Sequence, residues 1–88
     1  MVTTWKQMVE NKYPLSDIKE GSREFEIMKK AAENGDMTAQ HSMGIWYQDV
    51  MGDPEEAKKW YKRAEDQGHE GAKKAYSDLR EKKYREKI

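Results

Sequence analysis

The sequence predicts an all-α fold, a short α/α solenoid of about two helix pairs followed by a C-terminal capping helix, and three observations lead to it. Apolar residues recur at spacings of three and four along most of the chain, which is the period of an amphipathic helix. After a short start at residues 2–4, no strand-length run alternates Val, Ile or Thr with polar residues. A shift by 33 residues places like residues over like, and such a period with two helices per unit is typical of helical repeats.

Two helices are expected in the first part of the chain. The first covers residues 3–12 and ends before Pro14, because a proline disfavours helical backbone in the residue before it. The second begins after Ser22, a good N-cap residue, and stops at Asn34-Gly35, because glycine tolerates the left-handed backbone that ends many helices. The residues expected on the buried faces of these helices are Trp5, Met8, Val9, Tyr13, Phe25, Met28, Ala31 and Ala32.

Three further helices are expected after Gly35. The third covers residues 36–50 with Asp36 as its cap, and the fourth starts at Asp53-Pro54, where a capping carboxylate precedes a proline that has no amide to leave unbonded. The fifth covers residues 70–86 and serves as the cap of the fold. The residues expected to be buried on these helices are Ala39, Met43, Trp46, Tyr47, Val50, Ala57, Trp60, Tyr61, Ala64, Ala72, Ala75, Tyr76 and Leu79.

The repeat is visible in pairs of residues that lie 33 positions apart. These pairs are Lys29 with Lys62, Ala31 with Ala64, Gly35 with Gly68 and Ala39 with Ala72. Gly44 lies inside the third expected helix, where glycine costs about 1 kcal/mol relative to alanine. We therefore expect a neighbouring helix to cross too close to Gly44 for a side chain to fit. Trp60 and Tyr61 are expected to fill the space between successive helix pairs.

Parts of the sequence resemble Sel-one-like repeats, a branch of the tetratricopeptide-like superfamily. The segment Ala39–Tyr47 resembles the first helix of these repeats, with Ala, a large aliphatic residue, Gly and Tyr at the family's spacings. The segment Ala57–His69 resembles their second helix, and Met28–Gly35 is similar to the end of a preceding repeat. The Gly-x-Gly-Val loop of the family is replaced by the shorter Gln48–Gly52. The resemblance implies one helical repeat domain over residues 1–88, with residues 36–68 as the best-matching repeat.

The resemblance also implies a function, because such proteins are non-catalytic scaffolds that hold other proteins together. It implies a protein–protein interaction module, either a compact adaptor or a stoichiometric inhibitor. In the superfamily, partner segments lie on the concave face formed by the first helix of each repeat. The residues of this chain at those positions are Thr38, His41, Ile45, Gln48 and Asp49. Ile45 is the sizeable apolar side chain among them and falls outside the expected buried face, so it is the expected anchor for a partner.

The chemistry-bearing residues argue against an enzyme. The chain has no Cys, and its two histidines, His41 and His69, are far apart in sequence without a ligand cluster around them, so no metal is expected. The carboxylates are dispersed among lysines, and no glycine-rich phosphate loop is present. We therefore expect no catalytic residue, no cofactor and no small-molecule substrate. The apolar runs are too short for a membrane-spanning helix, and a cytoplasmic location is expected.

Two alternatives to an interaction module remain open, one from the charge distribution and one from the repeats. The 17 basic residues balance the 17 acidic ones, but residues 1–71 carry a net charge of −4 and residues 72–88 carry +4. The basic tail, residues 80–88, could make the protein a nucleic-acid or membrane accessory, although the interspersed glutamates make its electrostatic footprint weak. Alternatively, exposed repeat ends could stack between copies in a structural, self-associating protein. The expected partner remains another protein, and a homo-oligomer is possible.

Overall fold

The structure is a computed structural model in which residues 4–86 are described, with side chains described up to residue 81. Over this range every regular element is helical, so the expected all-α class is confirmed. The elements are α1 (Trp5–Glu10), the 3-10 turn η1 (Leu15–Asp17), α2 (Arg23–Glu33), α3 (Met37–Ile45), its π-helical continuation η2 (Trp46–Val50), α4 (Pro54–Asp66) and α5 (Glu70–Glu86). The side chains of the basic tail beyond residue 81, and residues 87–88, lie outside the described part.

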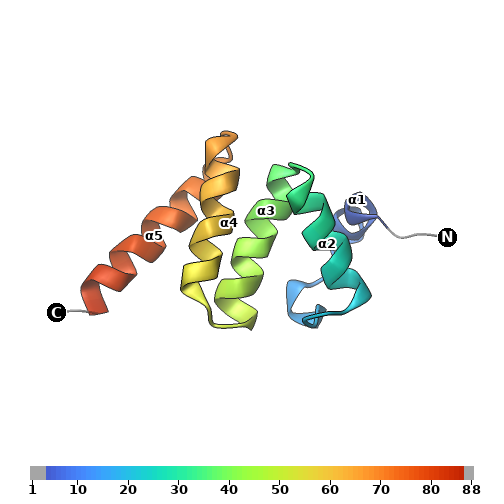
Figure 1. Ribbon diagram of the computed structural model, residues 1–88, viewed down its shortest axis with the longest axis horizontal. Helices are drawn as coiled ribbons and strands as arrows, with labels where there is room; N and C mark the ends of the chain where they lie inside the picture. Colours follow the sequence, from blue (N-terminus) through green and yellow to red (C-terminus); the bar gives the residue numbers. More distant parts are fainter. Residues whose placement is uncertain (1–3, 87–88) are drawn as a thin grey trace.

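The helices lie side by side in chain order. Figure 1 shows α2, α3, α4 and α5 running alternately up and down, with α1 beside α2 at one end and α5 at the other. The most extensive contacts join α2 to α3, α3 to α4 and α4 to α5, that is, helices adjacent in sequence. The molecule is accordingly elongated, with extents of 51 × 26 × 19 Å.

Capping side chains fix where the helices begin. Ser22 accepts a hydrogen bond from the amide of Phe25 at 3.1 Å, which confirms it as the cap of α2. Asp36 caps α3 and Asp53 caps α4 in the same way, as the sequence predicts. The first helix is shorter than the expected 3–12, because Thr4 caps α1 and the helix ends at Glu10. Residue 3 lies outside the described residues.

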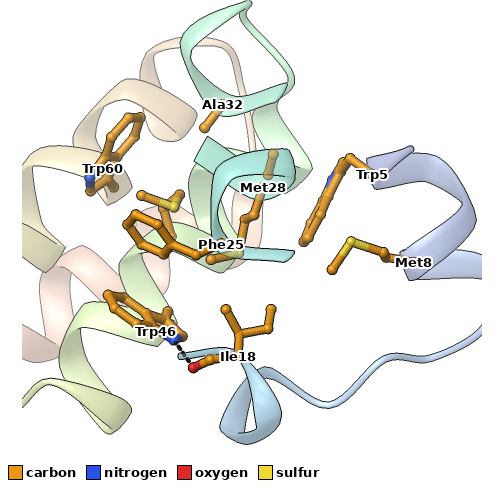
Figure 2. Close-up of a cluster of buried hydrophobic side chains, with 10 residues drawn as sticks. Trp5, Met8, Ile18, Phe25, Met28, Ala32, Trp46 and Trp60 are labelled. Atoms are coloured by element: carbon orange, nitrogen blue, oxygen red, sulfur yellow. Dashed lines mark hydrogen bonds between the residues drawn. The ribbon is translucent and has the colours of Figure 1, made fainter. Parts of the chain in front are cut away.

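The larger of two core clusters joins α1, α2 and α3 (Figure 2). Its buried members are Trp5, Met8, Ile18, Phe25, Met28, Ala32, Ala39, Met43, Trp46 and Trp60. The indole of Trp46 donates a hydrogen bond to the carbonyl of Ile18 at 2.9 Å, and its ring centroid lies 4.7 Å from that of Phe25 with the two planes tilted by 45°. Ile18 was not expected in the core, because it lies in the connection between two helices; its carbonyl and side chain together anchor that connection beneath α3.

The second cluster joins α4 to α5 and contains Ala57, Tyr61, Ala64, Ala72 and Leu79. Gly44 on α3 faces Tyr61, because a Cβ built on this glycine would lie 2.9 Å from Cζ of the ring and closer still to two other ring carbons. The expected close crossing at Gly44 is therefore confirmed. Trp60 belongs to the first cluster and Tyr61 to the second, so adjacent residues of α4 hold the two sides of the molecule together.

Three residues expected in the core are exposed instead. Val9 and Tyr13 keep 45% and 37% of their surface, because α1 lies at the end of the row and has helices on one side only. Val50 keeps 40%, because α3 ends in a π-helical turn rather than an α-helical one. In this turn the amide of Met51 bonds the carbonyl of Trp46, five residues back, which changes the spacing at which residues return to the same face.

Candidate functional site

The residues predicted to bind a partner lie along α3 and its π-turn and are called the α3 stripe below: Thr38, His41, Ile45, Gln48 and Asp49. They do not form one open surface. Thr38 and Asp49 are exposed, whereas the other three are half-buried. The stripe divides between two neighbours, since Thr38 faces α1 and the half-buried members face α4 and α5.

His41 lies against a second histidine, although it was expected on the concave face that binds a partner. Its ring stacks on that of His69 with 4.5 Å between centroids, and the ring of Tyr61 lies 5.8 Å away. Burial, assisted by the neighbouring His69, lowers the pKa of His41 below its usual 6.5. At neutral pH His41 is therefore an uncharged ring packed at the junction of α3 and α5.

His69 caps the last helix. Its Nδ1 accepts a hydrogen bond from the amide of Ala72 at 3.0 Å, so His69 is the N-cap residue of α5. The contact with His41 was not foreseen. Nothing in the spacing of two residues on separate helices indicates it, because the contact depends on the register between α3 and α5.

Ile45 is less available than expected. It is half-buried and packs against the second cluster, which includes Ala57 and Tyr61 of α4. The expectation that Ile45 stands outside the core is therefore wrong in part. A polar substitution here would disturb packing as well as any binding.

Gln48 and Asp49 are tied to Tyr61. The Tyr61 hydroxyl donates a hydrogen bond to Oε1 of Gln48 at 2.8 Å. Burial and the nearby carboxylate of Asp49 raise the pKa of Tyr61 to about 12, so the phenol stays protonated and keeps donating. Part of the hydrogen-bonding capacity of Gln48 is thus used inside the fold, while Asp49 remains exposed.

Thr38 lines a groove of about 200 Å³ between α1 and α3, called the α1 groove below. Its lining residues are Trp5, Met8, Val9, Lys12, Tyr13, Leu15, Thr38 and Ser42. Most of these side chains are apolar, Val9 is exposed beside them, and Lys12 is the charged group. Tyr13 and Met8 also border a second hollow of about 270 Å³ towards α2.

The sequence reasoning missed the α1 groove, because it assigned Val9 and Tyr13 to the core. The apolar spacing could not reveal this exposure, because it depends on the position of α1 at the end of the row of helices. Trp5 adds to this picture: its indole N–H is buried without a hydrogen-bond partner among the described residues. An unpaired buried donor costs free energy. Trp5 therefore fixes α1 to the core less strongly than it would if its indole N–H were hydrogen-bonded.

Among the side chains of residues 4–81, which the structure describes, no group of three or more His, Cys, Asp or Glu comes close enough to hold a metal ion. None of the helices described there combines the length and apolar character needed to cross a membrane. Comparison with protein-family models, curated proteins and solved structures finds no match to this chain. The resemblance to Sel-one-like repeats thus remains a hypothesis.

Proposed function

We propose that this protein is a non-catalytic protein-interaction module of the Sel-one-like kind, a compact cytoplasmic adaptor or stoichiometric inhibitor. The observation that carries the proposal is the α1 groove, an apolar hollow with exposed Val9 and Tyr13 at its border. Exposed apolar side chains around a concave site are typical of surfaces that bind a partner. The proposed face comprises this groove and the exposed Thr38 of the α3 stripe.

The ends of the helices support the repeat part of the proposal. The carbonyl of Ala31 accepts the amide of Asp36 at 3.0 Å, and 33 positions later the carbonyl of Ala64 accepts the amide of His69 at 3.1 Å. The side chains of Asp36 and His69 then cap the next helices in the same way. Such agreement supports two copies of one helix–turn–helix unit, and a row of neighbouring contacts suits a solenoid.

The size of the groove limits what can bind. A hollow of about 200 Å³ accepts one large apolar side chain and the backbone beside it, rather than a long peptide. The hydroxyls of Thr38 and Ser42 can fix the orientation of that backbone through hydrogen bonds. The proposed partner is therefore a short protein segment that presents a single apolar anchor, since a few such anchors commonly supply most of the binding energy.

A matched pair of double variants tests this function. Val9→Gln with Tyr13→Gln removes the apolar border of the groove, while Met37→Gln with Met51→Gln removes equally exposed apolar groups, 40% and 43% exposed, that do not line it. Each protein would be coupled to a support, and proteins recovered from native cell extract would be quantified by mass spectrometry. We expect one specific protein whose recovery falls about tenfold or more for the groove variant only, about 1.4 kcal/mol of binding energy.

Two outcomes would redirect the proposal. Equal loss in both variants would mean that general surface hydrophobicity, not the α1 groove, captures the partner. Recovery of the chain itself as the specific partner would favour the self-associating alternative. The melting temperatures of both variants must stay close to that of the unchanged protein, which circular dichroism checks beforehand.

A further inference from the structure

The two histidines of the chain meet at the junction between α3 and α5. Their rings stack at 4.5 Å between centroids. The first turn of α5 lies close to both rings. A Cβ built on Gly71 in this turn would lie 3.0 Å from Cε1 of His69 and 3.4 Å from Cε1 of His41. The contact therefore links α3 directly to the beginning of the last helix.

The hydrogen bond that His69 accepts uses the lone pair of its Nδ1 atom. Nδ1 accepts the amide of Ala72 at 3.0 Å, so this atom must carry a lone pair and not a proton. Ala72 is fully buried, and its amide would find no water in exchange if the bond were lost.

The groups around His41 and His69 do little to stabilise a positive charge on either ring. From α3 comes His41, from α4 the ring of Tyr61, whose hydroxyl is bonded to Gln48, and from α5 the backbone at Gly71. Besides burial, the neighbouring ring of His69 lowers the pKa of His41. Glu70, which follows His69 in the chain, is exposed to solvent, where screening weakens its attraction.

We propose that His41 and His69 form a pH-sensitive latch, which holds the start of α5 against α3 at neutral pH and releases it in mildly acidic solution. A proton from solvent that binds Nδ1 of His69 takes the lone pair used by the Ala72 amide, so the cap is lost. A second proton on His41 places two cations in stacking contact, which repel each other. This inference goes beyond the proposed function and does not depend on it.

The direction of the pH effect follows from the proton balance. In the unfolded chain a histidine titrates near pH 6.5, whereas burial and His69 lower the pKa of His41 in the folded protein. Below about pH 6.5 the unfolded state therefore binds more protons than the folded state. Stability is complete above this pH and falls as the pH decreases through the lower, folded-state pKa.

Thermal unfolding of the full chain at pH 7.5 and pH 5.5 tests the latch. Three variants accompany the unchanged protein: His69→Asn, which keeps an acceptor for the Ala72 amide but cannot be protonated, His41→Gln, and both together. We expect the melting temperature of the unchanged protein to fall by about 4 °C or more at pH 5.5, and that of the double variant by about 1 °C or less. The decrease in melting temperature of each single variant should lie between these two values.

The comparison is decisive because the chain has no Cys and only these two histidines, so no other side chain normally titrates in this range. An equal decrease in the double variant, or no decrease in the unchanged protein, would overturn the latch. If a variant does not fold, hydrogen exchange of the unchanged protein still decides. Protection of the Ala72 amide should fall about tenfold between pH 7.5 and pH 5.5, after correction for intrinsic exchange rates.

The amide of Ala39 is the matched control for that measurement. It occupies the equivalent position at the start of α3 and is bonded to a carboxylate oxygen of Asp36 at 3.0 Å rather than to an imidazole nitrogen. Its protection should stay constant. Equal loss of protection at Ala39 and Ala72 would show global loosening and contradict a local latch.

Discussion

Gly44 illustrates how one residue sets the distance between two helices. The missing side chain lets the ring of Tyr61 lie against the backbone of α3, while the hydroxyl of the same ring is held by Gln48. The ring is thus held both along the side that carries Cδ1 and Cε1 and at its hydroxyl group, and has little freedom to move aside. The helix-propensity cost of the glycine is offset by a close contact that alanine would not permit.

We predict that Gly44→Ala destabilises the protein by about 1–3 kcal/mol, although alanine is the better helix former, because the added methyl group collides with Tyr61. Urea denaturation followed by circular dichroism measures the change. Ser77→Ala at an exposed position of α5 is the control and should stay within about 0.5 kcal/mol. Equal stability of the Gly44 variant and the unchanged protein would refute the close packing of this crossing.

At the residue scale, some features could be predicted from the sequence and others could not. The caps Ser22, Asp36 and Asp53 were predictable, because an N-cap is a local interaction within four residues. The burial of Gln40 was not. Its side chain donates to the carbonyl of Ala32 at 2.9 Å and accepts from Gln67 at 2.8 Å, a bridge that exists only once the ends of α2 and α4 both lie against the start of α3.

Among the elements, α4 has the most demanding role, since it borders both core clusters. Trp60 packs into the cluster of α1, α2 and α3. The guanidinium of Arg63 lies over its indole, 4.6 Å from the ring centroid. Ala57, Tyr61 and Ala64 serve the cluster shared with α5. Because α4 contributes to both clusters, its packing determines whether the two clusters unfold together.

We predict that Trp60→Ala destabilises the protein by about 3–5 kcal/mol, because it leaves a large cavity where α4 meets the first cluster. A small domain has a total stability that starts at about 5 kcal/mol, so the melting temperature should fall sharply and the transition should broaden. Differential scanning calorimetry measures both. A melting temperature close to that of the unchanged protein would mean that Trp60 does not hold α4 to α2 and α3.

The boundaries of α2, α4 and α5 agree with the sequence prediction, because caps, glycine stops and apolar periodicity all indicate the same residues. The prediction failed for α1 and for the end of α3. In α1 the periodicity gave a longer helix than tertiary contacts support. At Trp46–Val50 the pattern assumed an α-helical spacing, whereas the backbone forms a π-turn that the apolar pattern alone does not reveal.

The whole molecule is a single row of helices, and its dimensions provide a test of self-association. The Cα radius of gyration is 13.1 Å, above the roughly 12 Å typical of a compact chain of this length. We predict that small-angle X-ray scattering gives the dimensions of one elongated, folded monomer, with a longest distance near the 51 Å extent of the structure. The scattering radius should not change over a dilution series.

A radius that grows with concentration would contradict this prediction. It would favour the alternative in which exposed ends of the row stack between copies. The groove variant Val9→Gln with Tyr13→Gln is a useful comparison, because it removes exposed apolar surface at the α1 end. Loss of concentration dependence in that variant alone would identify α1 as the stacking end.

The neighbour-to-neighbour packing of the helices also bears on how the chain reaches its fold. Because the main contacts join helices that follow one another in sequence, few residues must find partners across the whole chain. Proteins rich in such local contacts fold on the microsecond-to-millisecond scale, since little loop-closure entropy is lost before contacts form. We expect the pair α3–α4 to form first, because these two helices make the most extensive contacts and include the close approach of Gly44 to Tyr61. From it the structure can grow in both directions, towards α1 and towards α5.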